Sequence, residues 1–242
     1  MSTIDKKEIE KFSKLAKDWW NQNRKFRTLH LFNPARISFI KDKLISHFTL
    51  NPNGEKPLEK LKILDIGCGG GLLCEPLHRL GATITGIDAS NDNIKVAKLH
   101  SKEMNLNFKY IHTAPENLDL KNNTYDAVLC MEVVEHLKDV NLFIENCSKL
   151  IKKNGIMFVA TINKNLKSYV FAILGAEYVL RWLPIGTHDW DKFLTPQELE
   201  IITSKNNFVT DEIVGMKFNL LSKKWFRSRD SSVNYISTFL KN

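Results

Sequence analysis

An apolar run that ends in three closely spaced glycines constrains the fold of this chain more than any other feature. The run LKILDI leads into Gly67, Gly69 and Gly71, and a second apolar run, TITGID, ends on Asp88. Glycine has no Cβ, so the backbone can turn sharply there and approach a ligand closely. An acidic residue about 20 positions further on, at the end of the next strand, is placed to accept hydrogen bonds from ribose hydroxyls. The pattern predicts a strand–loop–helix unit that binds a nucleoside cofactor.

The spacing of the glycines separates two classes of cofactor site. A dinucleotide-binding loop reads GxGxxG, and its third glycine lets a helix pack closely and face a pyrophosphate. In this chain the glycines alternate with other residues, Asp65 precedes them, and Leu72 stands where the dinucleotide pattern requires glycine. The order D-x-G-x-G-x-G resembles motif I of the class I methyltransferases, which bind S-adenosylmethionine. A dinucleotide site and a glycine-rich turn without a ligand are the alternatives.

Length and composition are those of one globular domain. A chain of 242 residues with 43% hydrophobic content can bury a sizeable core. Alternating strands and helices predict an α/β fold with a doubly wound, mostly parallel sheet of seven strands. We expect a single domain over residues 1–242 with four parts: N-terminal helices forming a lid (1–50), a cofactor-binding core (60–163), an insertion after the fifth strand (164–192), and a closing helix with strands (193–242).

Local patterns place several of these elements. The nearly continuous apolar run Tyr125–Met131 is typical of a strand buried on both faces of a parallel sheet. The residues from Thr195 to Glu198, TPQE, match a capping box with proline in the first turn, so a helix should begin there. The other expected elements are a helix at Val140–Leu150, a turn at Asn154-Gly155, and strands at Phe108–His112, Ile156–Ile162, Phe208–Phe218 and Val233–Phe239.

The net charge and the cysteines limit which binding partners and which cellular compartment we expect. The net charge of +8 arises from 28 lysines and 7 arginines, and it favours an anionic partner. The lysines are scattered and not interleaved with aromatic residues, which argues against nucleic acid. The four cysteines form no CxxC pair, and the chain shows neither a secretory signal nor an apolar run long enough to span a bilayer. We therefore expect reduced thiols and a cytoplasmic location.

The segment MEVVEHL, Met131–Leu137, follows the run expected as the fourth strand. Ligands of doubly wound sheets lie beyond the carboxyl ends of the strands, so this segment should border cofactor and substrate. If the chain turns helical there, Glu132, Glu135 and His136 share one helix face and could hold a divalent cation. The alternative is that the glutamates are solvated and that His136 is a hydrogen-bonded structural or active-site histidine.

Several segments, in order along the chain, together resemble the ubiquinone-biosynthesis O-methyltransferases. They are FSKLAKDWWN (Phe12–Asn21), LHLFNPAR (Leu29–Arg36), LDIGCGGGLL, GIDAS, CMEVVEHL and LPIGTHDWDKFLTPQEL (Leu183–Leu199), with VNYI near the end. The glycine motif alone indicates a superfamily, whereas MEVVEH with GTHDW is far more specific. The resemblance implies a Rossmann-like class I methyltransferase fold, S-adenosylmethionine as cofactor, and polyprenylated phenols or hydroquinones as substrates of both O-methylation steps of ubiquinone biosynthesis.

The resemblance also implies which residues bind the cofactor: Arg36, Gly67, Asp88 and Met131. Asp88 has an independent rationale as an acceptor for ribose hydroxyls. Met131 could pack its polarizable thioether against the adenosine. Arg36 could pair with the carboxylate of the cofactor's methionine end.

By the same resemblance, Glu132, Glu135 and His136 are catalytic and hold a divalent cation, Mg²⁺ or a similar ion. A phenol titrates near pH 10, so only about one part in a thousand is phenolate at neutral pH. Adjacent phenolic oxygens could chelate the cation, which would lower their pKa and orient the nucleophile toward the methyl group. Without a metal, His136 becomes the candidate general base.

The segment Tyr169–Leu183 indicates how the enzyme could reach a substrate with a long apolar tail. Glu177 and Arg181 are its only charged residues, and it is too short to span a bilayer but suits an interfacial helix. We expect peripheral association with anionic lipid at the inner face of the cell membrane, with other ubiquinone-biosynthesis enzymes as further partners. A buried lid or dimer helix is the alternative. The apolar stripe within Phe12–Trp20 is expected to pack over the cofactor.

Other functions stay open at this point. A nucleic-acid methyltransferase or another small-molecule methyltransferase would share the fold, although the first would need a basic groove or an appended binding domain. A non-catalytic membrane-binding protein would keep the insertion and lose the cofactor.

Overall fold

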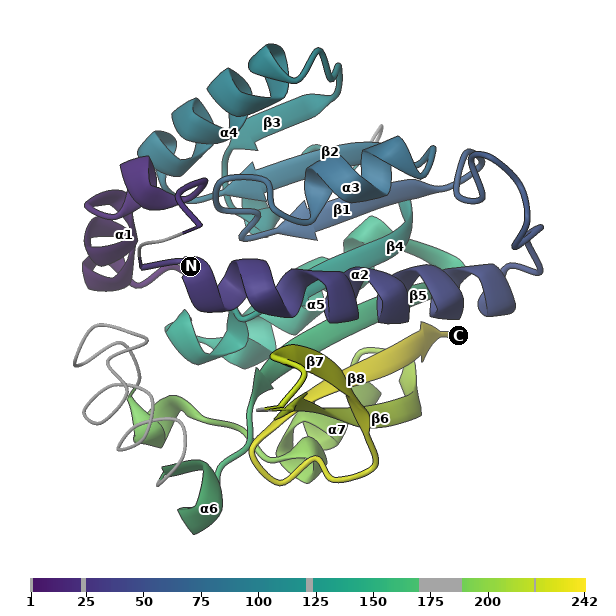
Figure 1. Ribbon diagram of the computed structural model, residues 1–242. Coiled ribbons are helices and arrows are strands. Elements are labelled where there is room, and N and C mark those ends of the chain that lie inside the picture. The colour runs from purple at the N-terminus through teal and green to yellow at the C-terminus, as the bar shows by residue number, and fades with distance from the viewer. Residues whose placement is uncertain (1, 23–24, 121–123, 170–188, 220) are drawn as a thin grey trace.

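An eight-stranded sheet forms the centre of the structure, with strand order β3-β2-β1-β4-β5-β8-β6-β7 (Figure 1). This computed structural model describes residues 2–22, 25–120, 124–169, 189–219 and 221–242. The strands are β1 (Lys62–Ile66), β2 (Thr83–Asp88), β3 (Lys109–His112), β4 (Tyr125–Met131), β5 (Ile151–Ile162), β6 (Phe208–Asn219), β7 (Lys224–Ser228) and β8 (Asn234–Lys241). The helices are α1 (Lys6–Ser13), α2 (Arg27–His47), α3 (Cys74–Arg79), α4 (Asn91–Glu103), α5 (Val140–Leu150), α6 (Leu166–Ser168) and α7 (Pro196–Ser204).

The sheet is parallel on one side and antiparallel on the other. β1 pairs in parallel with β2 and β4, β2 with β3, and β4 with β5. β8 runs antiparallel between β5 and β6, and β7 runs antiparallel along β6. The doubly wound, mostly parallel α/β fold is thus confirmed. The described residues contain one strand more than the seven expected, because the sequence of β7, KWFRS, mixes charged and aromatic residues and shows no apolar run.

Apolar side chains cover both faces of the sheet. On one face α2, α3 and α4 pack against the strands, with Phe39 and Phe158 fully buried between them. In Figure 1 the long helix α2 crosses in front of this face. On the opposite face α5 and α7 pack through Phe143 and Leu199. The neighbours Ile63 and Leu64 of β1 are fully buried in the two different cores, as expected for a strand covered on both sides.

Several predicted elements are confirmed, some with shifted ends. α5 has the expected bounds, and α7 begins with the predicted capping box, in which the side chains of Thr195 and Glu198 each accept the other's backbone amide. β5 begins earlier than expected, at Ile151. The predicted turn at Asn154-Gly155 is therefore an irregularity inside the strand, where Asn154 has a φ of +61° and the pairing with β4 shifts register.

The N-terminal segment is tied to loops at the carboxyl ends of the strands. The amide of Thr3 donates to Oε1 of Glu116 at 2.9 Å, and the amide of Lys138 donates to the carbonyl of Thr3 at 3.0 Å. Ile4 forms an antiparallel bridge with Leu137. These contacts place the start of the chain beside the turn that follows β4. The division of the domain into lid, core, insertion and closing segment stays a prediction.

Residues 170–188, which make up most of the predicted insertion, lie outside the described residues. In the parts of the chain that the structure describes, no helix is both long and apolar enough to cross a membrane.

Candidate active site

A cavity of about 790 Å³ opens at the carboxyl ends of β1, β2 and β4. Its volume lies in the upper part of the range for small-molecule sites, about 300–1,000 Å³. The structure brings all the predicted site residues into its wall: Arg36, Gly67, Asp88, Met131, Glu132, Glu135 and His136. This is the edge at which doubly wound sheets bind their ligands.

The glycine loop after β1 adopts a conformation that side chains would not tolerate. Gly67, Gly69 and Gly71 have φ angles of +70°, +54° and +91°, in the left-handed region. A Cβ on Gly67 would lie 2.6 Å from a methyl group of Val133, and a Cβ on Gly69 would collide with the ring of Trp19. The loop is therefore held between the turn after β4 and the N-terminal segment.

Asp88, at the end of β2, anchors this loop. Its carboxylate accepts the amide of Gly69 at 2.9 Å, the amide of Ser90 at 2.7 Å and the side-chain amide of Asn93 at 3.3 Å. Burial raises the pKa of the Asp88 carboxyl, and these donors oppose the rise. A carboxylate offers about four acceptor sites, so Asp88 retains capacity for a ribose hydroxyl.

Arg36 of α2 supplies a buried cation to the same cavity. It is 3% exposed, its Nη2 donates to Oδ1 of Asn33 at 3.0 Å, and its guanidinium lies 5.0 Å from the ring centroid of Phe32. Burial lowers its pKa, and the carboxyls of Glu132 and Asp65 oppose that change. Among the described residues its Nε has no hydrogen-bond partner. A carboxylate on a bound ligand would satisfy this donor.

The turn after β4 does not form the helix on which the predicted metal site depends. Glu132 has a φ of +59°, and only a short 3-10 turn, Val134–His136, follows it. A non-glycine residue in the left-handed region costs about 1–3 kcal/mol, so the surrounding structure holds Glu132 there against its local preference. Glu132, Glu135 and His136 therefore share no helix face. Within the described ranges, no three His, Cys, Asp or Glu side chains gather around a common metal position.

The two glutamates form a coupled pair of carboxyl groups. Glu135 is 3% exposed, and its Oε2 accepts a hydrogen bond from Oγ1 of Thr161 at 2.9 Å. Burial, and then repulsion from Glu132, raise the pKa of Glu135 well above its usual value. Burial also raises the pKa of Glu132, and the positive charge of Arg36 opposes this rise.

His136 turns to the N-terminal helix instead of the glutamates. Its Nδ1 lies 2.9 Å from Oε2 of Glu8, and its ring meets Phe12 edge-on with centroids 4.9 Å apart. The hydrogen bond from His136 lowers the pKa of Glu8, so the Glu8 carboxylate is ionised and can only accept. Nδ1 therefore carries the hydrogen, and Nε2 is the basic nitrogen of the neutral ring.

Three residues of the site were not predicted as functional: Glu8, Trp19 and Asn93. The indole Nε1 of Trp19 donates to Oδ1 of Asn93 at 2.9 Å, and Asn93 in turn donates to Asp88. The apolar stripe that contains Trp19 predicts a packing role, and the indole ring of Trp19 does lie against the glycine loop. Nothing in the pattern of α1 indicates that Glu8 meets a histidine 128 positions away.

Comparison with known proteins identifies the family. Residues 64–159 match the family model described as a methyltransferase domain. The chain is 56% identical to a ubiquinone biosynthesis O-methyltransferase of Pelagibacter ubique (strain HTCC1062), over 242 residues and 100% of both chains. It is 50% identical to the protein of the same name from Bartonella tribocorum, over 97% of this chain and 95% of that one.

Solved structures share the fold at low sequence identity. A methyltransferase of Thermotoga maritima that depends on S-adenosylmethionine has a TM-score of 0.66 at 16% identity, covering 96% of this chain and 98% of that one. The magnesium protoporphyrin IX methyltransferase of Synechocystis PCC 6803, with S-adenosylhomocysteine bound, has a TM-score of 0.61 at 16% identity, covering 100% and 90%. These likenesses confirm the class I methyltransferase fold. With half or more of its residues identical to those relatives along nearly their whole length, the chain belongs to the ubiquinone biosynthesis O-methyltransferases, a family of S-adenosylmethionine-dependent enzymes.

Proposed function

We propose that this protein transfers the methyl group of S-adenosylmethionine to phenolic hydroxyls of polyprenylated ubiquinone precursors, at both O-methylation steps of the pathway. One observation carries the proposal: a histidine whose tautomer is fixed by Glu8 lines the same cavity as the methyltransferase glycine loop. The names of the relatives support the substrate class. Because a quinone ring has no hydroxyl to alkylate, the substrate is the reduced form.

The cavity wall suits both charges of the cofactor's methionine end. Arg36, with its unpartnered Nε in the described structure, would bind the carboxylate through charge-assisted hydrogen bonds. Asp65 is 2% exposed, burial raises its pKa to about 7, and the ammonium group would favour its ionised form. Asp88 would accept the ribose hydroxyls, Met131 would pack against the adenosine, and Gly67 would let the backbone approach.

Transfer from a sulfonium is an in-line displacement in which the phenol loses its proton as its oxygen attacks. We assign Nε2 of His136 as the acceptor of that proton, with Glu8 orienting the ring and stabilising the imidazolium that forms. The new oxygen–carbon bond forms as the carbon–sulfur bond breaks, and S-adenosylhomocysteine leaves. Glu132 and Glu135 would orient the aromatic ring of the substrate by accepting a hydrogen bond from its second hydroxyl group.

A divalent cation is the second candidate for activating the phenol. The glutamates fit it, because carboxylate oxygens suit Mg²⁺ and Oε1 of Glu135 has no hydrogen-bond partner within the described residues. Within the described residues, however, the two glutamates and His136 do not gather around a common metal position. We therefore route no step of the reaction through a metal.

A methyl-transfer assay in chelator tests both candidates. With His136 as the base, turnover of short-chain reduced demethylubiquinone analogues in excess EDTA should stay within about twofold of the untreated enzyme. The readout is release of S-adenosylhomocysteine, with the oxidised quinone as a control that should not react. A loss of activity that Mg²⁺ restores would assign the cation. Failure to methylate any catechol or hydroquinone would contradict the proposed function.

We propose further that the segment Tyr169–Leu183 brings the enzyme to anionic lipid at the inner face of the cell membrane. Apart from Tyr169 the segment lies outside the described residues, so the support is its apolar sequence and the net charge of +8. Such binding would give the active site access to a substrate that is dissolved in the bilayer.

Replacing Phe171, Ile173 and Leu174 with serine should weaken co-sedimentation with anionic liposomes by about tenfold or more, because three apolar side chains leave the interface. Turnover of long-tailed phenols should fall as well, while turnover of a tail-less catechol should persist. The control replaces Ile201 and Val209, which are 57% and 52% exposed, with serine. If the triple variant sediments like the unchanged protein, the segment is a core or dimer element.

A further inference from the structure

The cavity continues past the predicted cofactor residues to the antiparallel side of the sheet. Its wall there is formed by Phe32 of α2, Met216 and Phe218 of β6, and Trp225 of β7, which together we name the aromatic arm. None of these four residues has a role in cofactor binding or proton transfer as described above. Their surface is apolar, and Trp225 and Phe218 are half-buried, so part of each ring remains accessible.

The rings of the aromatic arm hold one another in place. Phe218 and Trp225 face each other across the β6–β7 pair, with ring centroids 5.5 Å apart and planes at 55°. Trp225 also packs on Phe32 of α2, with centroids 4.6 Å apart. Met216 closes the wall and is 3% exposed. Cross-strand aromatic pairs of this kind stabilise a sheet, and here they also build a rigid apolar surface.

One end of the aromatic arm lies beside Arg36. The guanidinium of Arg36 lies over the ring of Phe32, 5.0 Å from its centroid, and the same guanidinium acts electrostatically on Glu132 and Asp65. A ligand with its polar head beside Glu132 and His136 can therefore extend its remainder along the aromatic arm.

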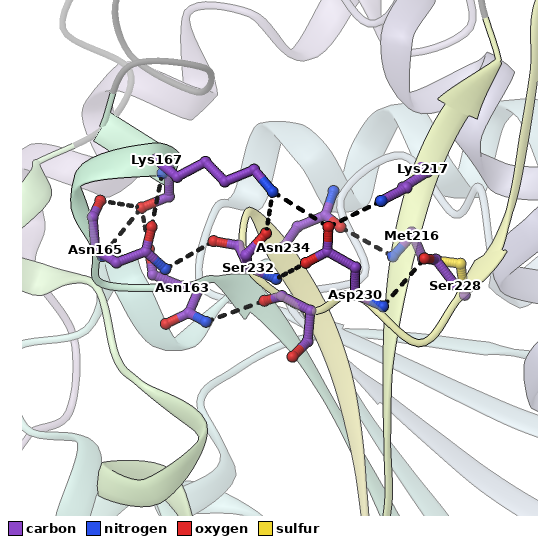
Figure 2. Close-up of polar contacts among 11 residues, drawn as sticks. Asn163, Asn165, Lys167, Met216, Lys217, Ser228, Asp230, Ser232 and Asn234 are labelled. Carbon is purple, nitrogen blue, oxygen red and sulfur yellow. Dashed lines mark hydrogen bonds and ion pairs between the residues drawn. The ribbon is translucent and has the colours of Figure 1, made fainter.

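A bridge of charged groups lines another part of the same cavity (Figure 2). Lys167 of α6 and Lys217 of β6 approach the same carboxylate oxygen of Asp230, at 3.2 and 2.8 Å. Lys167 also donates to Oγ of Ser232 at 2.6 Å. The three charged side chains line the cavity and are between 36% and 48% exposed, so they form its rim. The cavity thus holds an apolar wall that begins beside Arg36 and, separately, this charged rim.

We propose that the aromatic arm binds the first isoprene units of the substrate's hydrocarbon tail, next to the phenol ring. The inference rests on the proposed function for the identity of the tail, and on the structure for its place. The wall offers ring surface and a thioether, which pack well against a flat alkene chain, and Phe32 and Trp225 pack directly on each other.

The test compares substrates that differ in the tail alone. In Trp225→Ala and Phe218→Ala, kcat/KM for a prenylated demethylubiquinol analogue should fall about 10- to 100-fold, because apolar ring surface is lost from the wall. For the same head group without a tail, kcat/KM should change by less than about threefold. The matched control is Phe226→Ala, which removes an aromatic ring of β7 that is 46% exposed and does not line the cavity. Unchanged calorimetric affinity for S-adenosylmethionine shows that each variant is folded.

A binding experiment separates failure of this inference from failure of the proposed function. Farnesol, an isoprenoid alcohol, should bind to the protein loaded with S-adenosylhomocysteine, and Trp225→Ala should weaken that binding about tenfold or more. This result would support the aromatic arm as a hydrocarbon site even if no phenol were methylated. Equal losses for tailed and tail-less substrates would instead make the aromatic arm the ring site and overturn the inference. The inference would also be overturned if neither variant changed kcat/KM for the prenylated substrate or the binding of farnesol.

Discussion

Replacing His136 with alanine should lower turnover by about 10²- to 10⁴-fold, the usual contribution of a positioned general base. The affinity for S-adenosylmethionine should be nearly unchanged, because the proposed cofactor contacts are made by other residues. The phenol would have to lose its proton to water, and at neutral pH only about one part in a thousand is already ionised. Single-turnover kinetics with the reduced substrate, together with calorimetry of cofactor binding, would measure the two effects separately.

Two further variants complete this experiment: a control at a second histidine, His47, and a variant of Glu8, the hydrogen-bond partner of His136. His47→Ala removes an imidazole that hydrogen-bonds the carbonyl of Asn154, away from the cavity, and should leave turnover unchanged. Glu8→Gln retains an oxygen that can accept from Nδ1 but loses the charge, so turnover should fall less than in His136→Ala. If His136→Ala keeps turnover within about threefold, the histidine is not the base.

Replacing Asp88 with alanine should weaken binding of S-adenosylmethionine by about 10- to 150-fold, equivalent to the roughly 1.5–3 kcal/mol of a hydrogen bond to a charged group. Two effects contribute, because the carboxylate would bind the ribose and also holds the amides of Gly69 and Ser90. Titration calorimetry gives the affinity, and thermal unfolding shows whether the fold persists.

Asp88→Asn separates the two contributions. The asparagine carbonyl can still accept one amide of the loop but presents fewer acceptors to the ribose, so its affinity should lie between those of the unchanged protein and the alanine variant. An alanine variant with unaltered affinity would remove Asp88 from the cofactor site.

The parts of the site that sequence reasoning predicted are those determined by neighbouring residues. The glycine loop and Asp88 belong to one strand–loop–helix–strand unit, and the conformation of Gly67, Gly69 and Gly71 follows from the absence of a side chain. The continuous apolar run of β4 likewise predicted burial on both faces of the sheet. In each case the constraint acts over a few residues and is therefore visible as a pattern.

The conformation of the turn after β4 could not be predicted in this way. Glu132 is a good helix former, yet its amide donates to the carbonyl of Ala160 at 2.9 Å and extends the pairing with β5, which holds it at positive φ. The His136–Glu8 pair depends on packing of the chain's first helix against a distant turn. Such contacts are set by tertiary structure and leave no local pattern.

The position of the first twenty residues has a consequence for how the molecule is made. Thr3, Glu8 and Trp19 are made before their partners Glu116, His136 and Asn93, which follow many residues later in the chain. Glu8 must therefore wait without this native contact until β4 and the turn after it have been made. Only then can Glu8 orient His136, so the pair to which we assign proton transfer cannot form at an earlier stage of synthesis.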